Sequence, residues 1–184
     1  MLAQQVFGGH GYIAEHGMEQ FVRDARITTI FEGANGIQAL DLVGRKLPKD
    51  GGRALQAFFA EVSGYMEEAD AAMAPYVKPL GQALGELREA TLWFAQNAFG
   101  NPDSAAAGAT DYMQLFGLVA LGYMWCRIAA AAHEKLAADT SGRMNAKLVT
   151  ARFFMERMLP ETAAHLARIE AGAASVMELP AEMF

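Results

Sequence analysis

The stretch YMQLFGLVALGYMWC, residues 112–126, runs without a charge between Asp111 and Arg127 and decides the fold class. A membrane-spanning helix needs roughly 20 predominantly apolar residues. This stretch is shorter than that, and it contains Gln114. Because the segment is apolar on nearly every side, it predicts the central helix of a soluble helical bundle, and no transmembrane segment is expected.

Helical periodicity extends outward from this stretch. The central helix is expected over residues 104–138, with Ser104 or Asp103 as its N-cap, and further helices over 53–72, 80–98 and 144–171. No segment alternates with a period of two, so the predicted class is all-α. Apolar positions of the 53–72 segment recur at offsets of 0, 3, 4, 7 and 11, at Leu55, Phe58, Phe59, Val62 and Met66.

Prolines and glycines divide these helices. Pro75 and Pro79 should separate the first two helices, and Pro160 should kink or restart the last, because proline lacks a backbone donor. The polar segment LPKDGG, residues 47–52, is typical of a linker. It predicts a boundary between a domain of residues 1–47 and a helical domain of residues 48–184.

Composition excludes several classes of protein. Fifteen basic and twenty-one acidic residues give a net charge of -6, which argues against a nucleic-acid-binding surface. Cys126 is the only cysteine, so a disulfide framework is excluded and a reducing, cytoplasmic location is expected. The four histidines have no zinc-site spacing, and no metal is expected. The first residues do not read as a secretion signal. Cys126 and His133 are interpreted as packing residues.

Residues 4–47 are rich in glycine and carry the functional information. Gly9 to Ala14 match the GxGxx(G/A) pattern of dinucleotide-binding turns, but no parallel sheet surrounds them, so a Rossmann site is rejected. Two interpretations of Gly8, Gly9 and Gly11 remain open: the end of a short helix, or a close backbone approach to another group.

Glu32 lies in a second glycine loop, residues 31–36. It follows a short helix expected over residues 18–27, in which Glu19 and Arg23 are spaced to pair. The apolar Ile30 and Phe31 before it favour a partly desolvated carboxylate that could act as a base. An ordinary surface or ion-paired glutamate is the alternative interpretation.

Three motifs in this segment together resemble the C-terminal signature of FAD-dependent acyl-CoA dehydrogenases. They are QxxGGxGY from Gln5, RDARI from Arg23, and IFEGANGIQ from Ile30, in the same order and spacing as in the family. The resemblance of these motifs spans about 45 residues. The later helices resemble the extra C-terminal helical domain of the branch that includes the 3-methylmercaptopropionyl-CoA dehydrogenases.

The resemblance implies specific roles in the α,β-dehydrogenation of an acyl-CoA thioester. Glu32 falls on the catalytic base, and Gly33 lies where the backbone meets the substrate thioester. Arg23, Asp24 and Arg26 are interpreted as structural ion pairs. Phe31 and Ala34 replace the tyrosine and threonine common in the family, which removes a hydroxyl that could contact flavin. The residues implied to contact FAD are Gln5, Val6, Phe7, Gly8 and Gly9, reaching a neighbouring subunit, and Ala34, Asn35 and Gly36.

The resemblance also implies a homo-oligomer and an electron-transfer flavoprotein, or a similar protein, as electron acceptor. The family's N-terminal helical and middle β domains do not fit before Gln5. We therefore expect a C-terminal segment that is inactive alone. The alternative is a non-catalytic helical oligomerisation or interaction module derived from the family.

Overall fold

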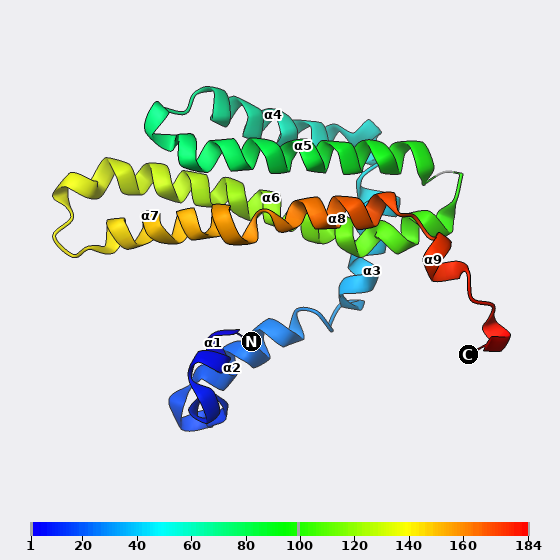
Figure 1. Ribbon diagram of the computed structural model, residues 1–184, viewed down its shortest axis with the longest axis horizontal. Coiled ribbons are helices and arrows are strands. Elements are labelled where there is room, and N and C mark those ends of the chain that lie inside the picture. The colour runs from blue at the N-terminus through cyan, green and yellow to red at the C-terminus, as the bar shows by residue number, and fades with distance from the viewer. Residues whose placement is uncertain (1, 99, 184) are drawn as a thin grey trace. The chain divides into compact units, whose positions relative to one another are not determined.

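The computed structural model describes residues 2–98 and 100–183, which form helices and turns and no β-strand (Figure 1). The predicted all-α class is confirmed for this part of the chain. Two compact units are distinguished, residues 1–39 and residues 40–184. The α-helices are α1 (Leu2–Val6), α2 (Met18–Ile27), α3 (Ala34–Asp41), α4 (Arg53–Glu67), α5 (Ala74–Asn97), α6 (Pro102–Lys135), α7 (Arg143–Phe153), α8 (Glu161–Glu170) and α9 (Ala174–Met177).

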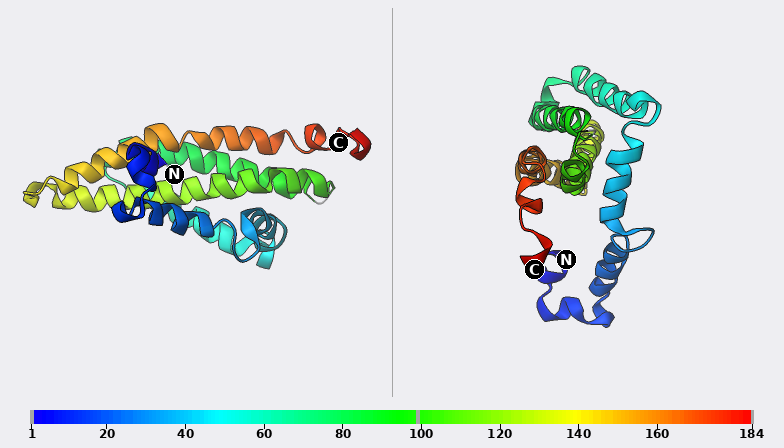
Figure 2. Two further views of the ribbon diagram at one scale, coloured as in Figure 1. Left: turned by 90° about the horizontal axis from the view of Figure 1, so that it is seen from below. Right: turned by 90° about the vertical axis from the view of Figure 1, so that its right-hand side faces the viewer.

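The second unit is a bundle in which α6 packs against α5, α7 and α8. In Figure 1, α4 lies along α5, and α7 and α8 follow one another along α6; the end-on view of Figure 2 shows α5, α6 and α8 gathered together. Residues Leu55, Phe59 and Val62 are buried, as the periodicity of the 53–72 segment predicts. The core is filled mainly by leucine and aromatic side chains, among them Leu80, Leu84, Leu87, Phe94, Tyr112, Leu115 and Leu159.

Helix α5 begins earlier than its prolines suggested. Its first residue is Ala74, Pro75 lies in the first turn, and Pro79 lies inside the helix. The expected start at residue 80 was therefore wrong. The first backbone N–H groups of a helix have no partner within it, so Pro75 in the first turn costs little stability. The missing N–H of Pro79 leaves only one carbonyl near the start of the helix without its donor.

The N-cap of α6 was also predicted at the wrong residue. Asn101, with extended backbone, accepts a hydrogen bond from the Ser104 backbone N–H at 3.2 Å, and Pro102 begins the helix. Asparagine is among the strongest N-cap residues, and proline is favoured at the first helical position. Ser104 and Asp103, the predicted caps, are therefore inside the helix.

Helix α6 is the central helix of the bundle, as predicted, but one stripe along it is exposed. Leu121, Met124 and Ile128 are exposed and lie on one stripe of the helix, at spacings of three and four. Among the described residues, the segment Pro102–Ala138 is the one helix long and apolar enough to cross a membrane by length and composition. Its opposite face, including Leu115, Val119 and Cys126, is buried in the bundle, and that packing accounts for much of its apolar character.

The last long helical segment is divided as Pro160 predicts. Helix α7 passes into a π-helical turn, Phe154–Met158, and α8 restarts at Glu161. The hydroxyl of the buried Thr162 donates a hydrogen bond of 2.8 Å to the carbonyl of Leu159. Proline cannot supply a backbone donor, so a local change of helical geometry is expected there.

Candidate functional site

The first unit has little core of its own. Among its described residues, Gly11 and Ala39 are buried, whereas large apolar side chains are widely exposed. Leu2, Val6 and Tyr12 are each more than 80% exposed. Apolar surface on this scale is costly in water and normally marks a contact with another part of a protein.

The glycines that follow α1 terminate this helix and allow the backbone to approach another group closely. Gly8 follows α1 with φ of +57°, and the side-chain amide of Gln4 donates a hydrogen bond of 3.3 Å to the Gly11 carbonyl. A Cβ at Gly11 would meet the backbone oxygen of Gln4. Both sequence interpretations of these glycines therefore apply, one to Gly8 and one to Gly11. The predicted cofactor-contacting residues 5–9 are exposed.

Helix α2 forms with the predicted bounds. The Arg23 Nε donates a hydrogen bond to a Glu19 carboxylate oxygen at 2.8 Å, so the predicted pair is present. Asp24 accepts instead from the Gln20 amide at 2.8 Å, and Arg26 donates to the Thr29 hydroxyl at 3.1 Å. Within residues 2–98 and 100–183 neither Asp24 nor Arg26 forms a salt bridge, so their role as structural ion pairs stays a prediction.

Glu32 lies in an unusual turn between α2 and α3. Glu32, Gly33 and Ala34 have φ values of +55°, +99° and +60°, so three successive residues are left-handed. For a residue with a Cβ this region costs on the order of 1–2 kcal/mol. Such conformations cluster at functional sites, where the surrounding structure holds them in place. The adjacent glycines and Asn35 indicate a turn in the sequence, but the left-handed backbone of Glu32 and Ala34 was not anticipated.

Two hydrogen bonds hold this turn. The Asn35 backbone N–H donates to the Thr29 carbonyl at 3.1 Å, and the Gln38 side-chain amide donates to the Phe31 carbonyl at 3.4 Å. They tie the N-terminal half of α3 to the segment that follows α2. The backbone on both sides of Glu32 is therefore constrained, while its carboxylate is exposed.

The Glu32 carboxylate is exposed, and the predicted partial desolvation is not provided by the described residues. Ile30 and Phe31 are themselves 51% and 45% exposed, so they do not cover it. An apolar neighbour in sequence shields a carboxylate only when other elements pack over both. In the first unit of this chain no such element is present among the described residues.

The residues predicted to contact a cofactor after the base form the start of α3. Its first turn contains no acidic residue, and a helix N-terminus carries partial positive charge. Gly36 is exposed, and a Cβ built there would have no neighbour within 4 Å, so the backbone is open to a bound group. The backbone N–H groups of this first turn and the partial positive charge of the helix N-terminus fit an anionic group such as a phosphate of a flavin dinucleotide.

Cys126 and His133 of the bundle are used in packing. Burial raises the pKa of the Cys126 thiol to about 12, which keeps it protonated and unreactive at neutral pH. His133 lies edge-on to the Tyr76 ring, with centroids 6.2 Å apart. Within residues 2–98 and 100–183 no cluster of three or more histidine, cysteine, aspartate or glutamate residues is placed to hold a metal ion.

Comparisons with known proteins identify the family of this chain. The family model described as acetyl-CoA dehydrogenase C-terminal like matches residues 58–180, and the acyl-CoA dehydrogenase C-terminal domain matches residues 1–47. The chain belongs to the acyl-CoA dehydrogenase family and corresponds to its C-terminal domains. Its similarity to individual members extends to the branch of the 3-methylmercaptopropionyl-CoA dehydrogenases.

Three curated relatives illustrate that similarity. The 3-methylmercaptopropionyl-CoA dehydrogenase of Ruegeria pomeroyi is 36% identical over 172 residues, which cover 91% of this chain and 29% of the relative. The broad-specificity linear acyl-CoA dehydrogenase FadE5 of Mycobacterium tuberculosis is 29% identical over 98% of this chain, and a butyryl-CoA dehydrogenase of Syntrophomonas wolfei is 26% identical over 99%. The chain spans about 30% of the length of these relatives.

Proposed function

We propose that this chain is the C-terminal segment of an FAD-dependent acyl-CoA dehydrogenase and supplies the catalytic base. The observation that carries the proposal is the run of left-handed residues at Glu32, Gly33 and Ala34, within the motif that matches the family's C-terminal domain. This turn brings together the Glu32 carboxylate, the exposed Gly36 and the N-terminus of α3. The domain boundary is proposed at the 47–52 segment, with residues 48–184 as the additional helical domain.

In the proposed reaction, a Glu32 carboxylate oxygen takes the proton from the α-carbon of an acyl-CoA thioester. A bound FAD would supply the acceptor for the hydride that leaves the β-carbon. Gly33 offers its backbone close to the thioester, where a side chain would obstruct it. The backbone N–H groups of Ala34 and Gly36 would hold the cofactor, while the N–H of Asn35 is already bonded to the Thr29 carbonyl. A positioned base contributes on the order of 10² to 10⁴ in rate.

The carboxylate of the base must be shielded from water to act, and Glu32 is exposed in this chain. We attribute its covering to the N-terminal helical and middle β domains of the complete enzyme. The exposed apolar residues of the first unit, including Ile30, Phe31 and Ile37, support this, because they need a partner surface. The stretch of residues 5–9 reaches the FAD of a neighbouring subunit, an electron-transfer flavoprotein or similar protein accepts the electrons, and the isolated chain is inactive.

The intact mass of the native polypeptide that contains these residues, measured from source cells, tests the proposal that it works as a segment. A mass several-fold above 19.8 kDa is expected. A mass near 19.8 kDa, or turnover of an acyl-CoA by the isolated chain, would overturn it.

The second candidate is a non-catalytic interaction module, and the exposed stripe on α6 favours it. Leu121, Met124 and Ile128 repeat at the three and four spacing of a helix-pairing seam and have no covering element among the described residues. This candidate predicts a defined oligomer that depends on the stripe and not on Glu32. Replacing Leu121 and Ile128 by lysine should then lower the mass in solution, whereas Leu92→Lys, at an exposed position of α5, should not.

A further inference from the structure

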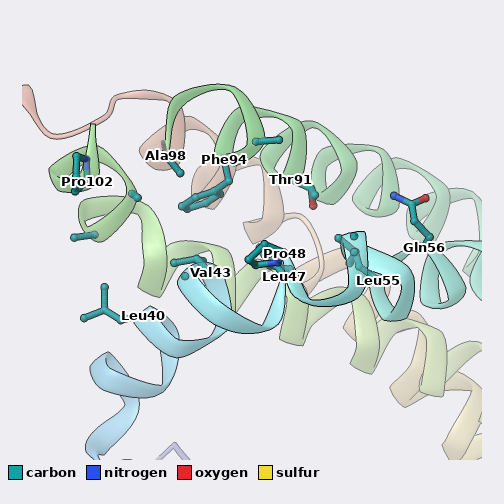
Figure 3. Close-up of a pocket in the computed structure, with 16 residues that line it drawn as sticks. Leu40, Val43, Leu47, Pro48, Leu55, Gln56, Thr91, Phe94, Ala98 and Pro102 are labelled. Atoms are coloured by element: carbon teal, nitrogen blue, oxygen red, sulfur yellow. The ribbon is translucent and has the colours of Figure 1, made fainter. Parts of the chain in front are cut away.

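The second unit contains a cavity of about 550 Å³ that the proposed reaction does not use (Figure 3). Figure 3 shows α5 forming one wall, with Thr91, Phe94 and Ala98, and the chain from Leu40 to Leu47 forming the other. The remaining contributors belong to the loop before α4, to the start of α4 and to the start of α6. The lining residues are Leu40, Val43, Gly44, Leu47, Pro48, Gly51, Gly52, Leu55, Gln56, Thr91, Phe94, Ala95, Ala98, Pro102, Ala105 and Ala106.

The lining is apolar and its one interior hydroxyl is already satisfied. Thr91 donates to the Leu87 carbonyl at 2.7 Å, and its oxygen lies 2.8 Å from the buried Tyr112 hydroxyl. Gln56, which also lines the cavity, is exposed to solvent. A polar ligand would therefore lose its hydrogen bonds to water without replacement, whereas an aliphatic chain would not.

The shape suits a linear chain. The α5 wall runs from Thr91 to Ala98, and seven residues of helix span about 10 Å at 1.5 Å per residue. Glycine and alanine make up much of the lining, so space is left between the two walls. The volume lies within the range of about 300–1,000 Å³ that is usual for small-molecule sites.

Residues 40–53, which form the second wall of the cavity and the loop before α4, are basic. Four basic side chains, at positions 45, 46, 49 and 53, accompany two acidic ones, Asp41 and Asp50. Asp41 is paired with Arg45 and Lys46, and Arg45 holds the pKa of the Asp41 carboxyl below its usual range. Arg53 lies 3.7 Å from Asp50 in an exposed pair of little strength.

Lys49 is the basic residue of this segment that forms no salt bridge within residues 2–98 and 100–183. It adjoins Pro48, which lines the cavity, and it is exposed. An apolar cavity beside an uncommitted cation is complementary to an anionic head on an aliphatic tail.

We propose that this cavity binds a single-chain fatty acid anion, with the alkyl tail between α5 and residues 40–47 and the carboxylate near Lys49 and Arg53. The site is distinct from the turn that carries Glu32, since its lining consists of residues 40–106 alone. It stands independently of the proposed dehydrogenase function.

A chain-length series tests the proposal on the 184-residue protein. Hexanoate, octanoate and decanoate, each below its micelle concentration, are titrated by calorimetry. Affinity is expected to rise about fourfold per added methylene, as for full burial of each group. Decanol is expected to bind more weakly than decanoate, and added salt is expected to reduce this difference. Equal affinity along the series, or no saturable binding, would overturn the proposal.

Two matched glycine variants locate the site. Gly44 lines the cavity and Gly117 is exposed on α6, and a Cβ at either would have no neighbour within 4 Å. Gly44→Leu should weaken decanoate binding at least tenfold by filling the cavity, and Gly117→Leu should leave it unchanged. Ala95→Leu is the second filling variant, should Gly44→Leu fail to fold by circular dichroism. Undiminished binding in a folded filling variant would overturn the assignment.

The charge and the source of the ligand are tested separately. Lys49→Gln is expected to weaken decanoate binding severalfold and to leave decanol binding unchanged. Vesicles of phosphatidylglycerol test a membrane as the source of acyl chains. Binding to vesicles without binding to monomeric decanoate would contradict the proposal, as would equal losses for decanoate and decanol in Lys49→Gln.

Discussion

The Nδ1 atom of His165 on α8 lies 2.7 Å from an Asp111 carboxylate oxygen on α6, and this contact links two helices 54 residues apart in sequence. The Arg168 guanidinium donates to the same oxygen at 3.2 Å. The side chains of His165 and Asp111 are only 14% and 23% exposed. The interaction therefore fixes α8 on α6 in a partly dry environment, where charged hydrogen bonds are stronger than at the surface.

Removing this carboxylate should destabilise the bundle. Asp111→Ala is expected to lower the free energy of unfolding by about 2 kcal/mol, because it leaves the two donors of α8 without their shared acceptor. Urea denaturation of the 184-residue chain measures the change. Glu134→Ala, at an exposed position on the same helix, serves as control and should stay within about 0.5 kcal/mol. Equal changes in the free energy of unfolding for the two substitutions would contradict a stabilising role of the α6–α8 contact.

A glycine pair on α6 tests how closely the helices approach. A Cβ at Gly122 would lie 3.3 Å from methyl groups of Leu80 and Leu159. Gly122→Leu should therefore cost about 1–3 kcal/mol through overpacking. Gly117 faces open space, and Gly117→Ala should raise stability by about 0.5–1 kcal/mol through better helix propensity. A neutral Gly122→Leu would contradict the close packing of α5, α6 and Leu159. Thermal unfolding by circular dichroism is the measurement.

Stability should fall at alkaline pH. Burial raises the pKa of the Cys126 thiol from 9.0 to about 12, so above pH 9 the unfolded chain loses a proton that the folded chain keeps. The free energy of unfolding is therefore highest below pH 9 and declines as the pH rises toward 12. Burial raises the pKa of Tyr112 to about 12 as well and adds to the decline. In Cys126→Ala the pH dependence should be shallower, and an unchanged slope would exclude this cause.

Much of the fold could be predicted from the sequence because helical periodicity records burial. The apolar positions Leu55, Phe59 and Val62 of α4 are buried as expected, and α2 has its predicted bounds. The helix ends were less predictable. Pro79 is tolerated near the start of a helix, and Asn101 caps α6 in place of Ser104. The position of a helix end depends on which backbone groups find hydrogen-bond partners outside the helix. The spacing of apolar residues carries no information about those partners.

The identity of the site residues stays a prediction, and the environment expected for Glu32 differs from the structure. The motif around Glu32 indicated the turn and the family, whereas the left-handed φ of Glu32 and Ala34 needs coordinates to be seen. The covering of Glu32 could not be predicted, because Ile30 and Phe31 shield it only if other elements pack over them. The cavity beside α5 left only a weak signal, since Gly44, Gly51 and Gly52 read equally well as linker residues.

The most direct test of the central claim is flavin reduction by an acyl-CoA in the complete enzyme carrying Glu32→Gln. We expect the flavin to remain bound, as its absorbance reports, while the rate of reduction falls at least a hundredfold, because the amide cannot accept the α-proton. Glu15→Gln, at another exposed acid of the first unit, should reduce flavin at the wild-type rate. Wild-type reduction by Glu32→Gln would contradict the assignment of Glu32 as the base.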